Sequence, residues 1–98
     1  MDVFLLGSVT NAADPAAKAM GHRNSNGASL FVTGTWTGTI TVEVSLDGTN
    51  WFTAVDNAGN AQSGITGNRF RLFGGNVPYV RTKKSATMTG QADVYLVF

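Results

Sequence analysis

The sequence contains no cysteine, only two prolines, one histidine and little charge. Without cysteine the chain can form neither disulfide bonds nor thiolate metal sites, and it has no thiol nucleophile. Charged residues make up 13% of the chain, and the net charge of +1 gives no field that would attract nucleic acid or a membrane. Because small secreted domains often depend on disulfides, their absence favours a protein that assembles inside a cell, or one that is stabilised by oligomerisation.

Residue combinations that carry catalysis are also missing. Glu43 is the only glutamate, and His22, the only histidine, has no carboxylate nearby in the sequence to position it as a base. The glycine patterns that bind phosphate are absent, and the oxygen-rich stretch 56–60 lacks the spacing of a calcium loop. No basic segment precedes the first apolar run, so no signal peptide is predicted. We therefore expect no enzymatic activity, no metal or other cofactor, and no membrane or specific nucleic-acid partner.

Alternating apolar and polar residues dominate the chain from Ala28 onward. The clearest case is TITVEVSL (39–46), which places its four aliphatic side chains on one face of a strand. Similar runs recur at intervals of 8–12 residues, which predicts an all-β antiparallel sandwich of about six to eight short strands, either a jelly roll or immunoglobulin-like. Residues 28–98 are interpreted as this single domain, with GTWTG (34–38) as a loop between strands.

Residues 1–27 lack this pattern, apart from an apolar run at residues 3–6. This run suits a short first strand or an arm. Residues 14–20 could begin a short helix, with Asp14 as the N-cap and Pro15 at the first helical position, but the segment has almost no apolar stripe. We interpret residues 1–27 as an N-terminal arm or extended loop.

The motif SLDGTNW (45–51) predicts a tight hairpin turn. Asp47 is suited to accept backbone hydrogen bonds within the turn, Gly48 to adopt a positive φ, and Trp51 to cover the end of the hairpin. The motif is similar to the Asp box of sialidase propellers but is one residue short and occurs once. A structural role is the main interpretation, and contact with a ligand is the alternative.

Several apolar residues fall on strand faces opposite the predicted core, or in the N-terminal run. In a chain with few charges, such residues suggest a surface that another subunit covers. Trp36, between threonines and glycines, is expected to be partly exposed and is also a candidate for stacking on a sugar, together with Tyr79. The candidate interface residues are Val3, Phe4, Leu5, Leu6, Phe31, Trp36, Tyr95 and Val97.

Five of the seven basic residues lie in two predicted strands: Arg69, Arg71, Arg81, Lys83 and Lys84. If the two strands paired, these side chains would form one basic patch. The patch would be either a solvated face whose lysines protect a sheet edge, or a site that docks on an acidic protein surface or makes weak contact with nucleic acid.

From Ala28 to the end, the order of features resembles the small β-sandwich structural proteins of tailed bacteriophages, such as head decoration proteins. The resemblance covers roughly 70 residues and includes the segment 34–38, the Ser-x-Asp-Gly-x-x-Trp turn and the later Tyr-Val-Arg before a final strand. It implies a non-enzymatic homo-oligomer, such as a trimer, that is made in the host cytoplasm and binds a capsid or other virion protein. The alternative is a small carbohydrate-binding module with a glycan ligand.

Overall fold

The structure is a computed structural model that describes residues 3–10, 14–20, 28–73, 78–85 and 87–97. These residues form eight strands and no helix, and therefore no helix that could cross a membrane. The strands are β1 (Val3–Val9), β2 (Lys18–Ala19), β3 (Ala28–Thr37), β4 (Ile40–Ser45), β5 (Trp51–Thr53), β6 (Arg69–Phe73), β7 (Tyr79–Lys84) and β8 (Thr89–Val97). The predicted all-β antiparallel sandwich is confirmed.

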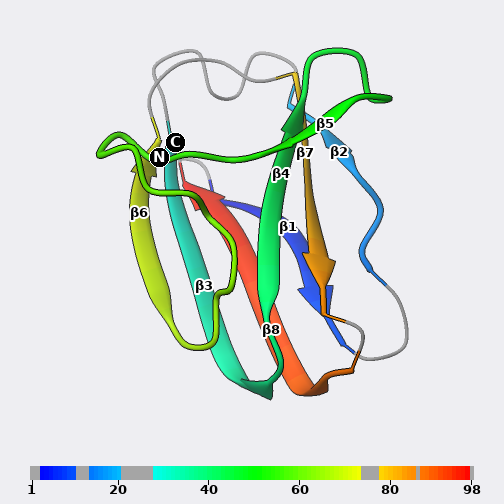
Figure 1. The fold of residues 1–98 in the computed structure, drawn as a ribbon, viewed down its shortest axis with the longest axis vertical. Helices are drawn as coiled ribbons and strands as arrows, with labels where there is room; N and C mark the ends of the chain where they lie inside the picture. The colour runs from blue at the N-terminus through cyan, green and yellow to red at the C-terminus, as the bar shows by residue number, and fades with distance from the viewer. Residues whose placement is uncertain (1–2, 11–13, 21–27, 74–77, 86, 98) are drawn as a thin grey trace.

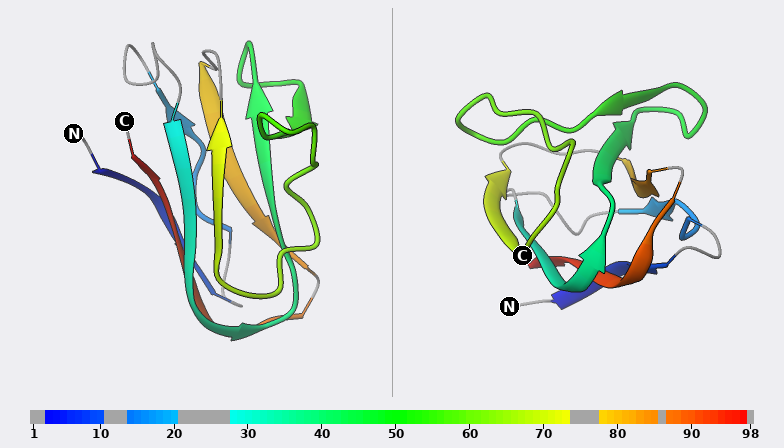
Figure 2. Two further views of the ribbon diagram at one scale, coloured as in Figure 1. Left: turned by 90° about the vertical axis from the view of Figure 1, so that its left-hand side faces the viewer. Right: turned by 60° about the horizontal axis from the view of Figure 1, so that its bottom comes forward.

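The strands make two four-stranded sheets, in the orders β1-β8-β3-β6 and β2-β7-β4-β5. Figure 1 shows the course of the chain, and the left view in Figure 2 shows the sheets as two layers. The first strand pairs with the last, β2 with β7, β3 with β6 and β4 with β5, all antiparallel. This is one long hairpin rolled into two sheets, the topology of a jelly roll, and it decides between the two sandwich types expected from the sequence.

The core lies between the two sheets. Leu30 and Val32 of β3 and Val94 of β8 are fully buried on one side, as the alternation predicted, and Ile40 and Val42 of β4 are fully buried on the other. The alternate residues of β3 and β8 point away from the core, which is the arrangement that a two-layer sandwich requires.

The interpretation of residues 1–27 as an arm is wrong for residues 3–9. They form strand β1, which pairs with β8 over six registered positions and has a register shift between Leu5 and Gly7. Leu6 and Val9 are buried in the core, so this strand belongs to the sandwich. Residues 14–20 form no helix: Lys18 and Ala19 pair with β7. Residues 11–13 and 21–27 lie outside the described part.

Segment 34–38, predicted as a loop, mostly continues β3, which is paired with β8 up to Thr37. Two glycines make this possible. Gly34 and Gly90 have φ values of +133° and +81°, and a Cβ at either would collide with the backbone of the opposite strand. Side chains rarely adopt such backbone conformations, so glycine allows the two long strands to approach and curve together.

Candidate interaction surface

The outer side of the first sheet carries two rows of apolar side chains. Strand register places Leu5, Tyr95, Phe31 and Phe70 opposite one another across all four strands. The next outward row consists of Val3, Val97, Ser29 and Leu72. Seven of these eight residues are apolar or aromatic, and we call the seven the outer apolar face.

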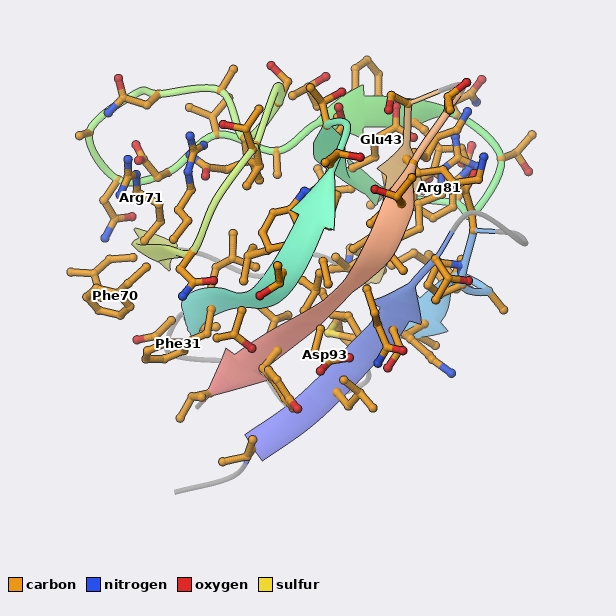
Figure 3. The ribbon with its side chains drawn as sticks, turned by 90° about the horizontal axis from the view of Figure 1, so that it is seen from below. Phe31, Glu43, Phe70, Arg71, Arg81 and Asp93 are labelled. Carbon is orange, nitrogen blue, oxygen red and sulfur yellow. The ribbon has the colours of Figure 1, made fainter. Side chains whose placement is uncertain are left out.

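The residues of the outer apolar face are exposed to different extents. Val3, Leu5, Phe70 and Leu72 keep 45–61% of their surface in contact with solvent, whereas Phe31, Tyr95 and Val97 are half-buried. The rings of Phe31 and Phe70 lie against each other with centroids 4.9 Å apart. Figure 3 shows these two rings side by side at one edge of the first sheet.

A shallow hollow of about 310 Å³ opens on the outer apolar face. Val3, Phe31, Thr33, Tyr95 and Val97 line it. These residues belong to β1, β3 and β8, so the hollow lies over the middle of the sheet, while Phe70 and Leu72 project from the neighbouring edge strand β6. The face therefore has an apolar concavity and, beside it on β6, the exposed side chains of Phe70 and Leu72, which we call the ridge.

The outer side of this sheet carries almost no charge. Among the outward side chains that the structure describes, Asp93 is the only charged one, and it lies on the row that pairs with Ser8 and Thr33. Its carboxylate accepts hydrogen bonds from Ser8 Oγ at 2.7 Å and from Gln91 Nε2 at 2.9 Å. Apart from Asp93, the described outward side chains offer a charged partner nothing to pair with, and the Asp93 carboxylate already accepts these two hydrogen bonds.

Of the candidate interface residues, the structure brings Val3, Leu5, Phe31, Tyr95 and Val97 together on this face. It places Leu6 and Trp36 elsewhere: both are buried in the core. The backbone of Phe4 pairs with Leu96, and its side chain lies outside the described part.

Trp36 was expected to be partly exposed, and this is wrong. It is 9% exposed and belongs to the core cluster, because β3 continues through this position and turns the indole inward. The indole Nε1 has no hydrogen-bond partner in the structure. A side chain in this position cannot stack on a sugar ring, which removes the main contact expected for a carbohydrate-binding module.

The five basic residues do not form one patch, because β6 and β7 belong to different sheets. On β6, Arg69 donates to Gln62 Oε1 at 3.3 Å, and Arg71 lies 3.4 Å from the carboxylate of Asp56. On β7, Arg81 pairs with Glu43 at 2.8 Å. The two neighbouring lysines do not join these arginines: Lys83 is exposed, and the Lys84 ammonium donates to the carbonyl of Ser85.

Phe70 and Leu72 belong to the outer apolar face but were not identified from the sequence. Alternation in NRFRLF separates two arginines from two apolar residues, and it is usual to assign the arginines to solvent. In the structure the two arginines face the loop after β5, where Arg71 pairs with Asp56 and Arg69 donates a hydrogen bond to Gln62. Figure 3 shows Arg71 and Phe70 at this edge of the molecule. The signal in the sequence that could have assigned Phe70 and Leu72 to the outside is the loop after β5, whose Asp and amide side chains can bind the arginines.

The outer side of the second sheet is polar. Trp51, half-buried, is stacked under the Arg81 guanidinium, whose carbon lies 4.2 Å from the ring centroid, and the same arginine holds Glu43. The Arg81 guanidinium, held by its ion pair with Glu43, thus covers one face of the Trp51 ring in a cation–π contact. Exposed sugar-stacking geometry is absent at Trp51, which is consistent with its expected structural role at the hairpin.

The turn at residues 45–50 is held as the sequence predicted. The Asp47 carboxylate accepts hydrogen bonds from the backbone N–H groups of Thr49 and Asn50 at 2.8 and 2.9 Å, and Gly48 has a φ of +80°. The hydrogen bonds that the backbone N–H groups of Asn50 and Thr49 donate to its carboxylate hold the pKa of Asp47 far below its usual range. In the next loop, the backbone N–H of Asn60 is the main cause that lowers the pKa of Asp56.

These two carboxylates predict how stability depends on pH. Each carboxyl group has a lower pKa in the folded chain than in the unfolded chain, so its ionised form stabilises the fold. This stabilisation is complete above the pKa of an unfolded aspartate, about 4, and is lost as the pH falls through the pKa of the folded state. We expect the free energy of unfolding, measured by urea titration, to fall between about pH 5 and about pH 2. The double substitution Asp47→Asn and Asp56→Asn should flatten this dependence. Equal slopes for the two proteins would contradict the assignment.

Within the described residues, no group of three or more His, Cys, Asp or Glu side chains could hold a metal ion. The sequence matches no known protein family and no curated protein. The fold is similar to that in the crystal structure of the SPBc2 prophage-derived protein YomS. The TM-score is 0.73 with 14% sequence identity, and the match covers 98% of this chain and 89% of that chain. At this identity the likeness establishes a shared sandwich fold.

Proposed function

We propose that the chain is a non-enzymatic structural component of a bacteriophage particle, most simply a capsid decoration protein that works as an oligomer. The observation that carries the proposal is the outer apolar face, because seven of the eight residues in two rows of one sheet are apolar or aromatic and none of the eight is charged. Contiguous apolar surface of this kind marks a site where another protein packs. The work of such a subunit is to bury this surface against neighbours, so that many copies add up to a firm attachment.

Two further observations support a phage origin. The sequence carries the order of features found in small phage sandwich proteins, and the solved structure with a similar fold comes from a prophage. An assembly role also agrees with the second sheet, where Arg81 pairs with Glu43 and stacks on Trp51.

The proposal is tested by asking whether the chain is part of purified particles. Particles of the phage that encodes it are banded on a density gradient and washed in high salt, and their proteins are quantified by mass spectrometry. We expect peptides of this chain in a constant ratio to the shell protein across the band. An equally abundant non-structural protein of the same phage is the control. If the chain stays in the soluble fraction with that control, the proposal is wrong.

A further inference from the structure

We infer that the outer apolar face packs against the same face of a second copy of this chain, so that the two copies are related by a two-fold axis. The inference rests on the proposed assembly role and adds to it the surface and the partner. Val3, Leu5, Phe31, Phe70, Leu72, Tyr95 and Val97 would form the centre of this interface.

The exposed apolar area matches the apolar part of what a stable dimer buries. A fully exposed apolar side chain of this size presents on the order of 150–200 Å² to solvent. From their exposed fractions, the seven residues together present roughly 400–500 Å² per copy. A standard interface buries about 800 Å² per partner, of which about 56–65% is apolar. The face therefore supplies the apolar part of one standard interface. Exposed hydroxyl-bearing residues farther along β3, Thr35 and Thr37, can provide a polar rim.

The charge distribution favours a copy of the same surface over a charged partner. An acidic protein or a nucleic acid would lose solvation against the outer apolar face without gaining an ion pair, and a basic protein would find only Asp93 beyond the apolar rows. Two copies of a neutral face bring no such cost. Asp93 lies one row beyond the apolar rows and keeps its hydrogen bonds to Ser8 and Gln91, so it need not be stripped of partners.

The shape of the face also suits self-association. An interface with two-fold symmetry uses the same patch on both subunits, so any projection on the patch needs a matching concavity on that same patch. The ridge made by Phe70 and Leu72 on β6 and the hollow of about 310 Å³ over β1, β8 and β3 satisfy this condition. In the dimer, the ridge of each copy would enter the hollow of the other.

Sedimentation equilibrium tests the inference with a pair of matched variants. Phe70 and Phe52 are exposed phenylalanines, 49% and 66% respectively, on different sheets. We expect the unmodified chain to have the mass of a dimer, and Phe70→Asp to raise the dimer dissociation constant by at least about tenfold. The change Phe52→Asp should alter it less than about twofold. A monomeric or trimeric unmodified chain, or equal effects of the two variants, would overturn the inference.

Disulfide trapping checks the geometry without disrupting the face. Because the chain has no cysteine, any disulfide formed by single-cysteine variants must join two copies. A mixture of Leu72→Cys and Thr33→Cys should give a mixed disulfide under mild oxidation, because ridge and hollow residues meet across the axis. Leu72→Cys mixed with Lys83→Cys, which lies on the second sheet, is the control and should give much less. Equal yields from both mixtures would overturn the arrangement even if Phe70→Asp misfolds.

The outcomes separate this inference from the proposed function. A dimer that is absent from purified particles leaves the interface correct and the phage role wrong. A chain that is present in particles but monomeric in solution, with equal yields in both trapping mixtures, leaves the phage role standing and overturns the two-fold interface.

Discussion

Replacing Gly90 with alanine should lower the free energy of unfolding by about 3–5 kcal/mol. Gly90 has a φ of +81°, where an alanine is strained, and its Cβ would collide with the carbonyl oxygen of Thr35 and lie 2.9 Å from the Cα of Trp36. Both obstacles are backbone atoms of the paired strand, so they cannot move aside as a flexible side chain would. Urea denaturation followed by tryptophan fluorescence measures the loss.

Substitutions at two other glycines distinguish the cost of backbone strain from the cost of a steric collision. Gly64 has a φ of +62°, and a Cβ added there would meet no atom within 4 Å, so Gly64→Ala should cost only the backbone strain, about 1–2 kcal/mol. Gly67 has neither restriction, and Gly67→Ala should change stability by less than about 0.5 kcal/mol. If Gly90→Ala were as stable as Gly67→Ala, the close approach of β3 and β8 would be incorrect.

Removing residues 1–9 should abolish cooperative unfolding. The deletion takes away β1, and with it Leu6 and Val9, which are 1% and 0% exposed. Two buried aliphatic side chains contribute about 1.5–3 kcal/mol each, and a domain of this size is stable by about 5–15 kcal/mol in all. The deletion also exposes the backbone edge of β8. Thermal denaturation followed by circular dichroism should show a broad, shallow change in place of a sharp transition.

Leu5→Ser is the matched control for this deletion. Leu5 lies on the same strand but faces outward and is 45% exposed, so its replacement removes no core packing: it weakens association of the copies but should leave the unfolding transition sharp. An arm that served only to link subunits would behave differently, since the deleted chain would then keep a sharp transition. That result would contradict the place of β1 within the sandwich.

Local patterns in the sequence predict much of the fold. Alternation correctly separates Leu30 and Val32 from Phe31, and Val94 and Leu96 from Tyr95, because each strand is buried on one face only. The Asp47-Gly48 turn is also predictable, because its hydrogen bonds involve residues within the turn itself. These features depend on neighbours in the chain, so a single sequence contains the information that decides them.

The features that the sequence does not predict depend on contacts between distant segments. Nothing within β6 shows that Arg69 and Arg71 will face Asp56 and Gln62, so Phe70 and Leu72 could not be assigned to the outside. Likewise, Gly34 resembles a loop residue until its position opposite Ala92 on β8 is known. The outer apolar face was therefore only partly identified, and its ridge on β6 is a finding of the structure.

The pairing of the first strand with the last has a practical consequence for any engineered form of this protein. Val3 lies opposite Val97, and both line the hollow, so the first and last residues that the structure describes lie together at this surface. An affinity tag or fluorescent protein fused at either end would crowd the surface through which the copies associate. An insertion between Asp47 and Gly48, in the exposed turn of the other sheet, would leave that rim clear.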